Sequence, residues 1–134
     1  MPHLVIEYSA NVADHHDIRA LVDVVHAAAL SHGLAATDAL RTRAVGRDLY
    51  RIADGHEANA FVAIQGRIAP GRDAATKRSF TEAVLDAAEA QVGSEQGPLA
   101  IAWSIELTEI DPASRINRNR VRERMAAAAT PEAP

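Results

Sequence analysis

Proline at position 2 is the residue of this sequence with the most distinctive chemistry. Methionine aminopeptidases remove Met1 when the second residue is small, and this removal would convert Pro2 into an N-terminal secondary amine. An ordinary α-amino group titrates at about 7.7–8.0, and burial among apolar groups lowers its pKa because it penalises the charged form. A buried Pro2 could then act as a neutral general base near physiological pH. The hypothesis requires removal of Met1, since a retained methionine would make this nitrogen an amide.

The composition indicates a single globular domain without cysteine chemistry. The chain has 134 residues, of which 48% are hydrophobic and 24% charged, and no apolar run is long enough to span a membrane. Because the sequence has no cysteine, disulfides and thiolate catalysis are excluded, and a cytoplasmic location is the simplest expectation. The net charge of −4 argues against nucleic acid as a partner, whereas a local cluster of arginines could still bind a small anion.

The histidines do not follow a metal-binding pattern. His15 and His16 are adjacent, so their side chains would point in different directions on a helix. His26 and His32 are separated by more than the three or four positions that place two ligands on one helix face. We therefore expect no metal site. His3 follows Pro2 and is expected to point to the other face of its strand.

The apolar residues divide the chain into two halves with the same order of elements. Alternation predicts the strands, and spacing at i, i+3, i+4 and i+7 predicts the helices. The first half, about 2–52, is expected to contain a strand over 3–8, a helix capped by Asp14 and ended by Gly33, a strand over 40–45 and a short return strand over 49–52. The second half, about 60–110, is expected to contain a strand over 61–68, a helix capped by Asp73 and ended by Gly93, and a strand over 99–107.

This repetition is typical of a tandem duplication of one β-α-β unit. Two such units predict an α/β (α+β layer) fold with a four-stranded core sheet, right-handed crossovers and both helices on one face. The other face is expected to carry Val5, Val62 and Ile64, and so apolar a face predicts oligomerisation through the sheets. Residues 111–125 are expected to form a short helix or a clasp on a neighbouring subunit. They complete a single domain over 1–125, and residues 126–134 are predicted to be a disordered tail.

Five separated segments carry a resemblance to a known family. They are PHLVIEYSAN at 2–11, YRIADG at 50–55, NAFV at 59–62, GRD at 71–73 and EIDP at 109–112. From Pro2 to about Arg120, the chain resembles the 5-carboxymethyl-2-hydroxymuconate isomerases of the tautomerase superfamily, which act in the breakdown of homoprotocatechuate. The resemblance implies a tautomerase-like homotrimer, Pro2 as the catalytic base and no cofactor.

The resemblance also assigns two arginines to the site. Arg41, at the start of the strand after the first helix, resembles the superfamily's strand arginine. Arg72 resembles the arginine that precedes the helix in the single-unit tautomerases. A guanidinium group binds a carboxylate through two hydrogen bonds, and Arg72 also lies at a helix N-terminus, where N–H groups favour anions. Because each half supplies only one of the two arginines, a complete site needs both halves, from one subunit or from two.

The implied activity is a 1,3-proton transfer on a 2-hydroxymuconate-type dienol acid. Two alternatives stay open. An enzyme with the same base could act on another 2-oxo or enol acid, such as an arylpyruvate or a halogenated acrylate, and a trimeric binding protein could have lost catalysis. The basic run over 117–124 is interpreted as a solvated face, and neither nucleic acid nor a membrane is expected as a partner.

Overall fold

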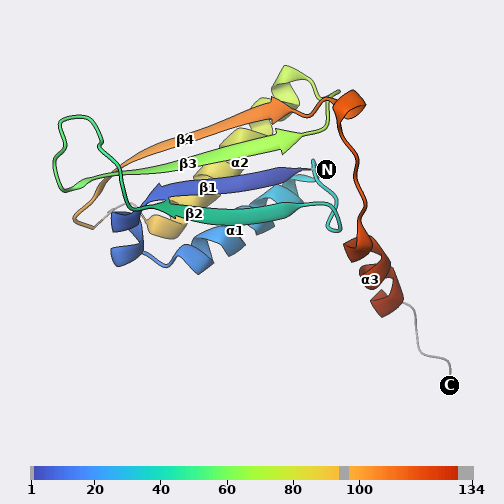
Figure 1. Ribbon diagram of the computed structural model, residues 1–134, viewed down its shortest axis with the longest axis horizontal. Helices are drawn as coiled ribbons and strands as arrows, with labels where there is room; N and C mark the ends of the chain where they lie inside the picture. The colour runs from blue at the N-terminus through green and yellow to red at the C-terminus, as the bar shows by residue number, and fades with distance from the viewer. Residues whose placement is uncertain (1, 94–96, 130–134) are drawn as a thin grey trace.

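A four-stranded mixed sheet with two long helices on one of its faces forms the body of the molecule (Figure 1). The computed structural model describes residues 2–93 and 97–129. The strands are β1 (His3–Ser9), β2 (Arg41–Arg47), β3 (Asn59–Ile68) and β4 (Ala100–Glu109), and they lie in the order β2-β1-β3-β4. The helices are α1 (Ile18–His32), α2 (Ala74–Val92) and α3 (Arg120–Ala129), with short 3-10 turns η1 (Ala10–Asp14) and η2 (Pro112–Ser114). The predicted architecture of two β-α-β units is confirmed.

The sheet is parallel within each unit and antiparallel between them. β1 pairs with β2 in parallel, β3 pairs with β4 in parallel, and β1 and β3 join the two units as antiparallel neighbours. The antiparallel pairing places His3, at the start of β1, opposite Arg67, near the end of β3. Pro2 and His3 therefore lie beside the loop that leads into α2.

The hydrophobic core lies between the two long helices and the sheet. Alternate residues of the central strands are fully buried, as are residues of the helices at spacings of four. These side chains include Leu4, Ile6, Val62, Ile64, Leu21, Val25, Phe80 and Val84. Full burial of one such side chain contributes about 1.5–3 kcal/mol, so this face of the sheet holds the two units together.

The predicted helix caps are confirmed at three of four ends. The carboxylate of Asp73 accepts a hydrogen bond from the backbone of Thr76, and Gly33 and Gly93 end α1 and α2. The prediction of Asp14 was wrong, because Asp17 is the residue whose carboxylate caps α1. Asp14 instead ends η1, a turn that extends the chain before the helix begins.

The predicted return strand over 49–52 was wrong. Residues 48–58 form an irregular loop in which Leu49 is 96% exposed. The loop satisfies its polar groups locally, since the amide of Asn59 donates to the backbone oxygen of Ile52 and to the carboxylate of Asp54. These bonds hold the loop without a further strand.

The prediction that Val62 and Ile64 lie on the helix-free face was also wrong. Ile64 pairs with Ile6 in the sheet, and both are buried beneath the helices. The alternation of side chains along a strand then places the odd-numbered residues of β3, such as Gln65 and Arg67, on the other face. Of the three predicted residues, Val5 alone pairs with a residue of that face, Gln65.

The C-terminal segment leaves β4 and crosses beyond the ends of β1 and β2 before it forms α3 (Figure 1). It is tied to the loop between α1 and β2, because both Asn119 and Arg122 donate to Asp38 at 2.7 Å. The predicted short helix is confirmed, but it continues through Ala129 into the expected disordered tail. Residues 130–134 lie outside the described residues. In the described part of the chain, no helix is long and apolar enough to cross a membrane.

Candidate active site

Pro2 lies at the end of the sheet that the C-terminal segment crosses. It is buried, and it immediately precedes β1, which is flanked by β2 and β3. The backbone oxygen of Pro2 accepts a hydrogen bond from the backbone N–H of Arg41 at 3.2 Å. The position of Pro2 is therefore fixed by the central strand of a rigid sheet.

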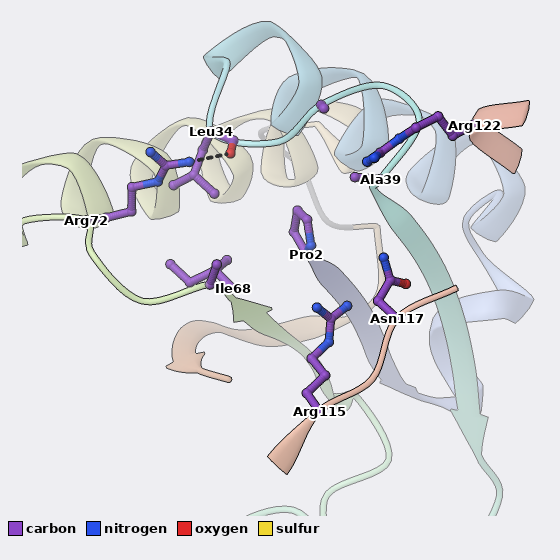
Figure 2. Close-up of a pocket in the computed structure, with 10 residues that line it drawn as sticks. Pro2, Leu34, Ala39, Ile68, Arg72, Arg115, Asn117 and Arg122 are labelled. Carbon is purple, nitrogen blue, oxygen red and sulfur yellow. Dashed lines mark hydrogen bonds between the residues drawn. The ribbon is translucent and has the colours of Figure 1, made fainter. Parts of the chain in front are cut away.

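A cavity of about 290 Å³ has Pro2 in its wall (Figure 2). Its apolar lining comes from the loop between α1 and β2 and from the end of β3. These residues are Leu34, Ala36, Ala39, Ile68 and Ala69. Its polar lining consists of Arg72, Arg115, Asn117 and Arg122. An apolar wall with a few cationic groups is suited to a small organic anion.

The structure brings one of the two predicted arginines, Arg72, into the cavity with Pro2. The antiparallel pairing of β1 and β3 causes this juxtaposition, because Arg72 follows the end of β3. Its guanidinium group donates to the backbone oxygen of Leu34 at 3.2 Å (Figure 2). The bond directs the guanidinium group along the wall of the cavity and leaves other N–H groups for an anion.

The structure does not bring Arg41 into this cavity. Arg41 pairs with His3 in the parallel ladder, and both residues belong to the helix-free face. The contact between Arg41 and Pro2 in the sheet is made by the backbone N–H of Arg41. A contact of the Arg41 side chain with a substrate at Pro2 therefore stays a prediction, and within one chain the geometry does not provide it.

Sequence reasoning missed three polar residues of the cavity, Arg115, Asn117 and Arg122. Asn117 and Arg122 belong to the basic run over 117–124 that is interpreted above as a solvated face, and Arg115 precedes it in the segment expected to form a short helix or a clasp. All three line the cavity. Arg122 forms an ion pair with Asp38 at 2.7 Å. The signal in the sequence is a run of arginines directly after the last strand, at the edge of the sheet where Pro2 lies.

His3 lies on the helix-free face, as predicted, and is surrounded by positive charge. Its Nδ1 is 3.2 Å from Nη1 of Arg43. Burial, and then the charges of Arg67, Arg43, Arg41 and Arg115, lower the pKa of His3 to about 4. His3 is therefore neutral at physiological pH, and its Nδ1 can accept a hydrogen bond from the Arg43 guanidinium group.

His26 and His32 form hydrogen bonds with hydroxyl groups of the fold. Nδ1 of His26 is 2.8 Å from the hydroxyl of Thr42, and Nε2 of His32 is 3.0 Å from the hydroxyl of Ser79. The ring of His32 also packs edge-on against Phe80. Over residues 2–93 and 97–129, no group of three or more His, Asp or Glu side chains is arranged to hold a metal ion.

Comparison with known proteins identifies the family. The model of the 5-carboxymethyl-2-hydroxymuconate isomerase family matches residues 2–125. The chain belongs to this family. Both the resemblance carried by the five sequence segments and the tautomerase-like fold are thus confirmed.

Individual relatives agree with this assignment. The chain is 24% identical over 121 residues to the 5-carboxymethyl-2-hydroxymuconate Delta-isomerase of Escherichia coli. The alignment covers 90% of this chain and 96% of the relative. A crystal structure of a 5-carboxymethyl-2-hydroxymuconate delta-isomerase matches with a TM-score of 0.85 at 23% identity, covering 99% of this chain and 96% of that one. A fused 4-OT, described as a wild type symmetric trimer, shares the fold with a TM-score of 0.60 at 15% identity, covering 85% and 94%.

Proposed function

We propose that this protein is a 5-carboxymethyl-2-hydroxymuconate delta-isomerase of homoprotocatechuate breakdown, with Pro2 as its general base. The observation that carries the proposal is the burial of Pro2 in a cavity that also contains Arg72. The reaction is a 1,3-proton transfer on a dienol acid and needs no cofactor. Membership of the family supports the same activity.

The cavity favours a neutral amine at Pro2. Leu34, Ala39 and Ile68 are apolar neighbours in the lining, and they offer no stabilisation to an ammonium ion. The guanidinium groups of Arg72 and Arg115 line the same cavity and disfavour a further positive charge. After removal of Met1, Pro2 would therefore be unprotonated at physiological pH and able to accept a proton.

The reaction then requires only proton movement and charge stabilisation. Neutral Pro2 removes a proton from the 2-hydroxyl group of the dienol, or from the allylic carbon of its 2-oxo tautomer, and either step leaves the same dienolate anion. Arg72 stabilises the negative charge as it spreads over the conjugated system. Protonated Pro2 then returns the same proton to a different carbon and yields the conjugated 2-oxo-ene acid. The amine ends in its starting state.

Arg41 is proposed to complete the site of a neighbouring subunit. It lies on the helix-free face, away from the cavity of its own chain. In a trimer whose subunits meet at these faces, Arg41 would lie at a subunit boundary, from which it is proposed to reach around the end of the sheet to the site of a neighbour. The trimeric neighbour and the family resemblance support this assembly.

A variant with one alanine inserted between Met1 and Pro2 tests the proposal. In this variant the Pro2 nitrogen is an amide, so we expect the rate of isomerisation to fall on the order of 10²–10⁴-fold, the usual contribution of a general base. The rate is measured from the change in ultraviolet absorbance as the dienol is consumed.

The matched control is Pro2→Ala, which keeps a free primary amine at the same position after removal of Met1 and should retain part of the activity. Thermal unfolding of both variants checks that the fold is intact. A full rate for the variant with the inserted alanine would show that the amine is not the base.

A second candidate function is isomerisation of a different enol acid by the same base. Pro2 and Arg72 recognise an enol next to an acid group and would serve either substrate. Comparing 5-carboxymethyl-2-hydroxymuconate with phenylenolpyruvate distinguishes the two, because the proposed function predicts the higher kcat/KM for the muconate. A trimer without activity on either would be the binding protein.

A further inference from the structure

Three guanidinium groups line the cavity at Pro2, but they differ in the hydrogen bonds and ion pairs that they form with the rest of the protein. Arg72 donates to the backbone oxygen of Leu34, and Arg122 is paired with Asp38. Arg115 forms no side-chain hydrogen bond or ion pair within the described ranges 2–93 and 97–129. It is also half-buried, so its charge lacks both a partner and full exposure to water.

The segment that carries Arg115 is held on both sides of it. Before Arg115, the backbone N–H of Ile110 donates to the backbone oxygen of Ile68 in β3, and the carboxylate of Asp111 accepts from the backbone N–H of Ala113. After it, the amide of Asn119 donates to the backbone oxygen of Asp38. A side chain on a segment anchored at both ends loses less conformational entropy when it binds a ligand.

The orientation of the side chains divides the cavity into two cationic sides. Figure 2 shows Arg72 on one side of Pro2, whereas Arg115 and Asn117 lie on another and Arg115 points toward Pro2. Among the described residues that line the cavity there is no carboxylate. Arg115 also lines a second hollow with Glu109 and Asp111, but it forms an ion pair with neither of them. A half-buried cation without a counter-charge is stabilised when a ligand supplies that charge.

We propose that Arg115, assisted by Asn117, binds a second carboxylate of the substrate and makes the protein selective for acids with two or more carboxylates. This inference rests on the proposed function for the reacting end of the substrate, which is held between Pro2 and Arg72. The guanidinium group of Arg115 would bind the distal carboxylate through two hydrogen bonds, and the amide of Asn117 would donate a third. Arg115 thus determines specificity and takes no part in proton transfer.

The test compares Arg115→Ala with Arg118→Ala on two substrates. Arg118 belongs to the same segment but is exposed and does not line the cavity, so it is the matched control. For 5-carboxymethyl-2-hydroxymuconate, we expect Arg115→Ala to raise KM about 10- to 100-fold, the range for hydrogen bonds to charged groups, and to leave kcat within about threefold. For phenylenolpyruvate, which has one carboxylate, KM should not change, and Arg118→Ala should resemble the unmutated protein with both substrates.

A binding measurement separates this inference from the proposed function. Isothermal titration uses cis,cis-muconate, a dicarboxylate that lacks the 2-hydroxyl group and cannot react. We expect Arg115→Ala to weaken its binding at least about tenfold, and Arg115→Lys to recover part of the loss. Weaker binding of muconate together with no isomerase activity in the unmutated protein would retain the carboxylate site and reject the isomerase.

Three results would overturn the role of Arg115. One is muconate binding that is unchanged in Arg115→Ala while isomerase activity is normal. Another is an equal rise in KM for both substrates, and the third is an unmutated protein that does not bind muconate. Arg115→Ala should unfold at the same temperature as the unmutated protein, because its side chain has no hydrogen bond in the described residues to lose.

Discussion

On the covered face of the sheet, Leu4, Ile6 and Ile64 are buried beneath α1 and α2, whereas the helix-free face presents His3, Arg43 and similar side chains from the same strands. The covered face supplies the apolar contacts that hold the two β-α-β units together. The helix-free face carries charge and has no helix over it. Neighbouring residues of one strand point to opposite faces of the sheet. An error of one position in the assigned register therefore places a core residue on the charged face and a charged residue in the core.

The contrast between the two faces determines where a site can form. Pro2 directly precedes β1 and is buried like the even-numbered residues of that strand, so it belongs to the covered side. The helices do not enclose it completely, because the cavity beside it is closed in part by the C-terminal segment through Arg115 and Asn117. His3 follows Pro2 in the chain, and the backbone N–H of Arg41 donates to the backbone oxygen of Pro2. The side chains of His3 and Arg41 nevertheless belong to the other face of the sheet.

The largest expected effect comes from a charge placed on the covered face. Val62→Asp would bury a carboxylate without a partner, and an unsatisfied buried polar group costs roughly 2–7 kcal/mol. Since typical domains are stable by only about 5–15 kcal/mol, we expect much of the protein to be unfolded. Urea denaturation followed by circular dichroism measures the loss.

The control for this prediction is Gln65→Asp, three positions along the same strand and exposed on the helix-free face. It should change the free energy of unfolding by much less than Val62→Asp. A Val62→Asp protein that stays folded and only dissociates into monomers would instead indicate that Val62 lies on the face through which subunits associate.

A smaller effect is expected from replacing Arg72 or Arg41, and the two variants should differ when their subunits are mixed with those of another variant. Both Arg72→Ala and Arg41→Ala should lower kcat/KM by about 10²-fold, comparable to the loss of one donor that stabilises a developing anion. If Arg41 acts on a neighbouring subunit, mixing the Arg41→Ala subunits with subunits carrying an alanine before Pro2 should restore part of the activity. Some sites would then combine an intact Pro2 with an intact Arg41.

Mixing Arg72→Ala subunits with subunits that carry an alanine before Pro2 should restore no activity. Arg72 lines the cavity of its own chain, so no mixed site would have both an intact Pro2 and an intact Arg72. The activity of subunits refolded together, compared with each variant alone, gives the answer. Equal behaviour of the two arginines on mixing would contradict the assignment of Arg41 to the other face.

Much of the fold could be predicted from the sequence because its signals are local. The two periods of the apolar residues located all four strands and both long helices, and the pair Asp73 and Gly93 marked the ends of α2. The orientation of Val62 could not be predicted in the same way. It depends on the pairing of β1 with β3, which joins residues far apart in the chain and is decided by the packing of both helices.

The candidate site shows the same division. Pro2 could be named in advance because a proline at position 2, directly before a strand, has a distinctive chemistry once Met1 is removed. Arg72 could be named because its place before a helix matches that of an arginine in the family that the chain resembles. Arg115 could not, because its location depends on the course of an irregular segment that is held by Asp38, a residue distant in the sequence. A run of arginines alone does not tell which of them faces a cavity.

Nitrogen NMR of protein labelled with ¹⁵N-proline can test the claim that Pro2 is a free amine with a lowered pKa. We predict one resonance from a secondary amine that titrates with pH, with a pKa below the value of about 7.7–8.0 of an ordinary α-amino group. The apolar and cationic lining of the cavity would cause that shift. A Pro2 nitrogen with the chemical shift of an amide, unchanged across the pH range, would contradict the claim.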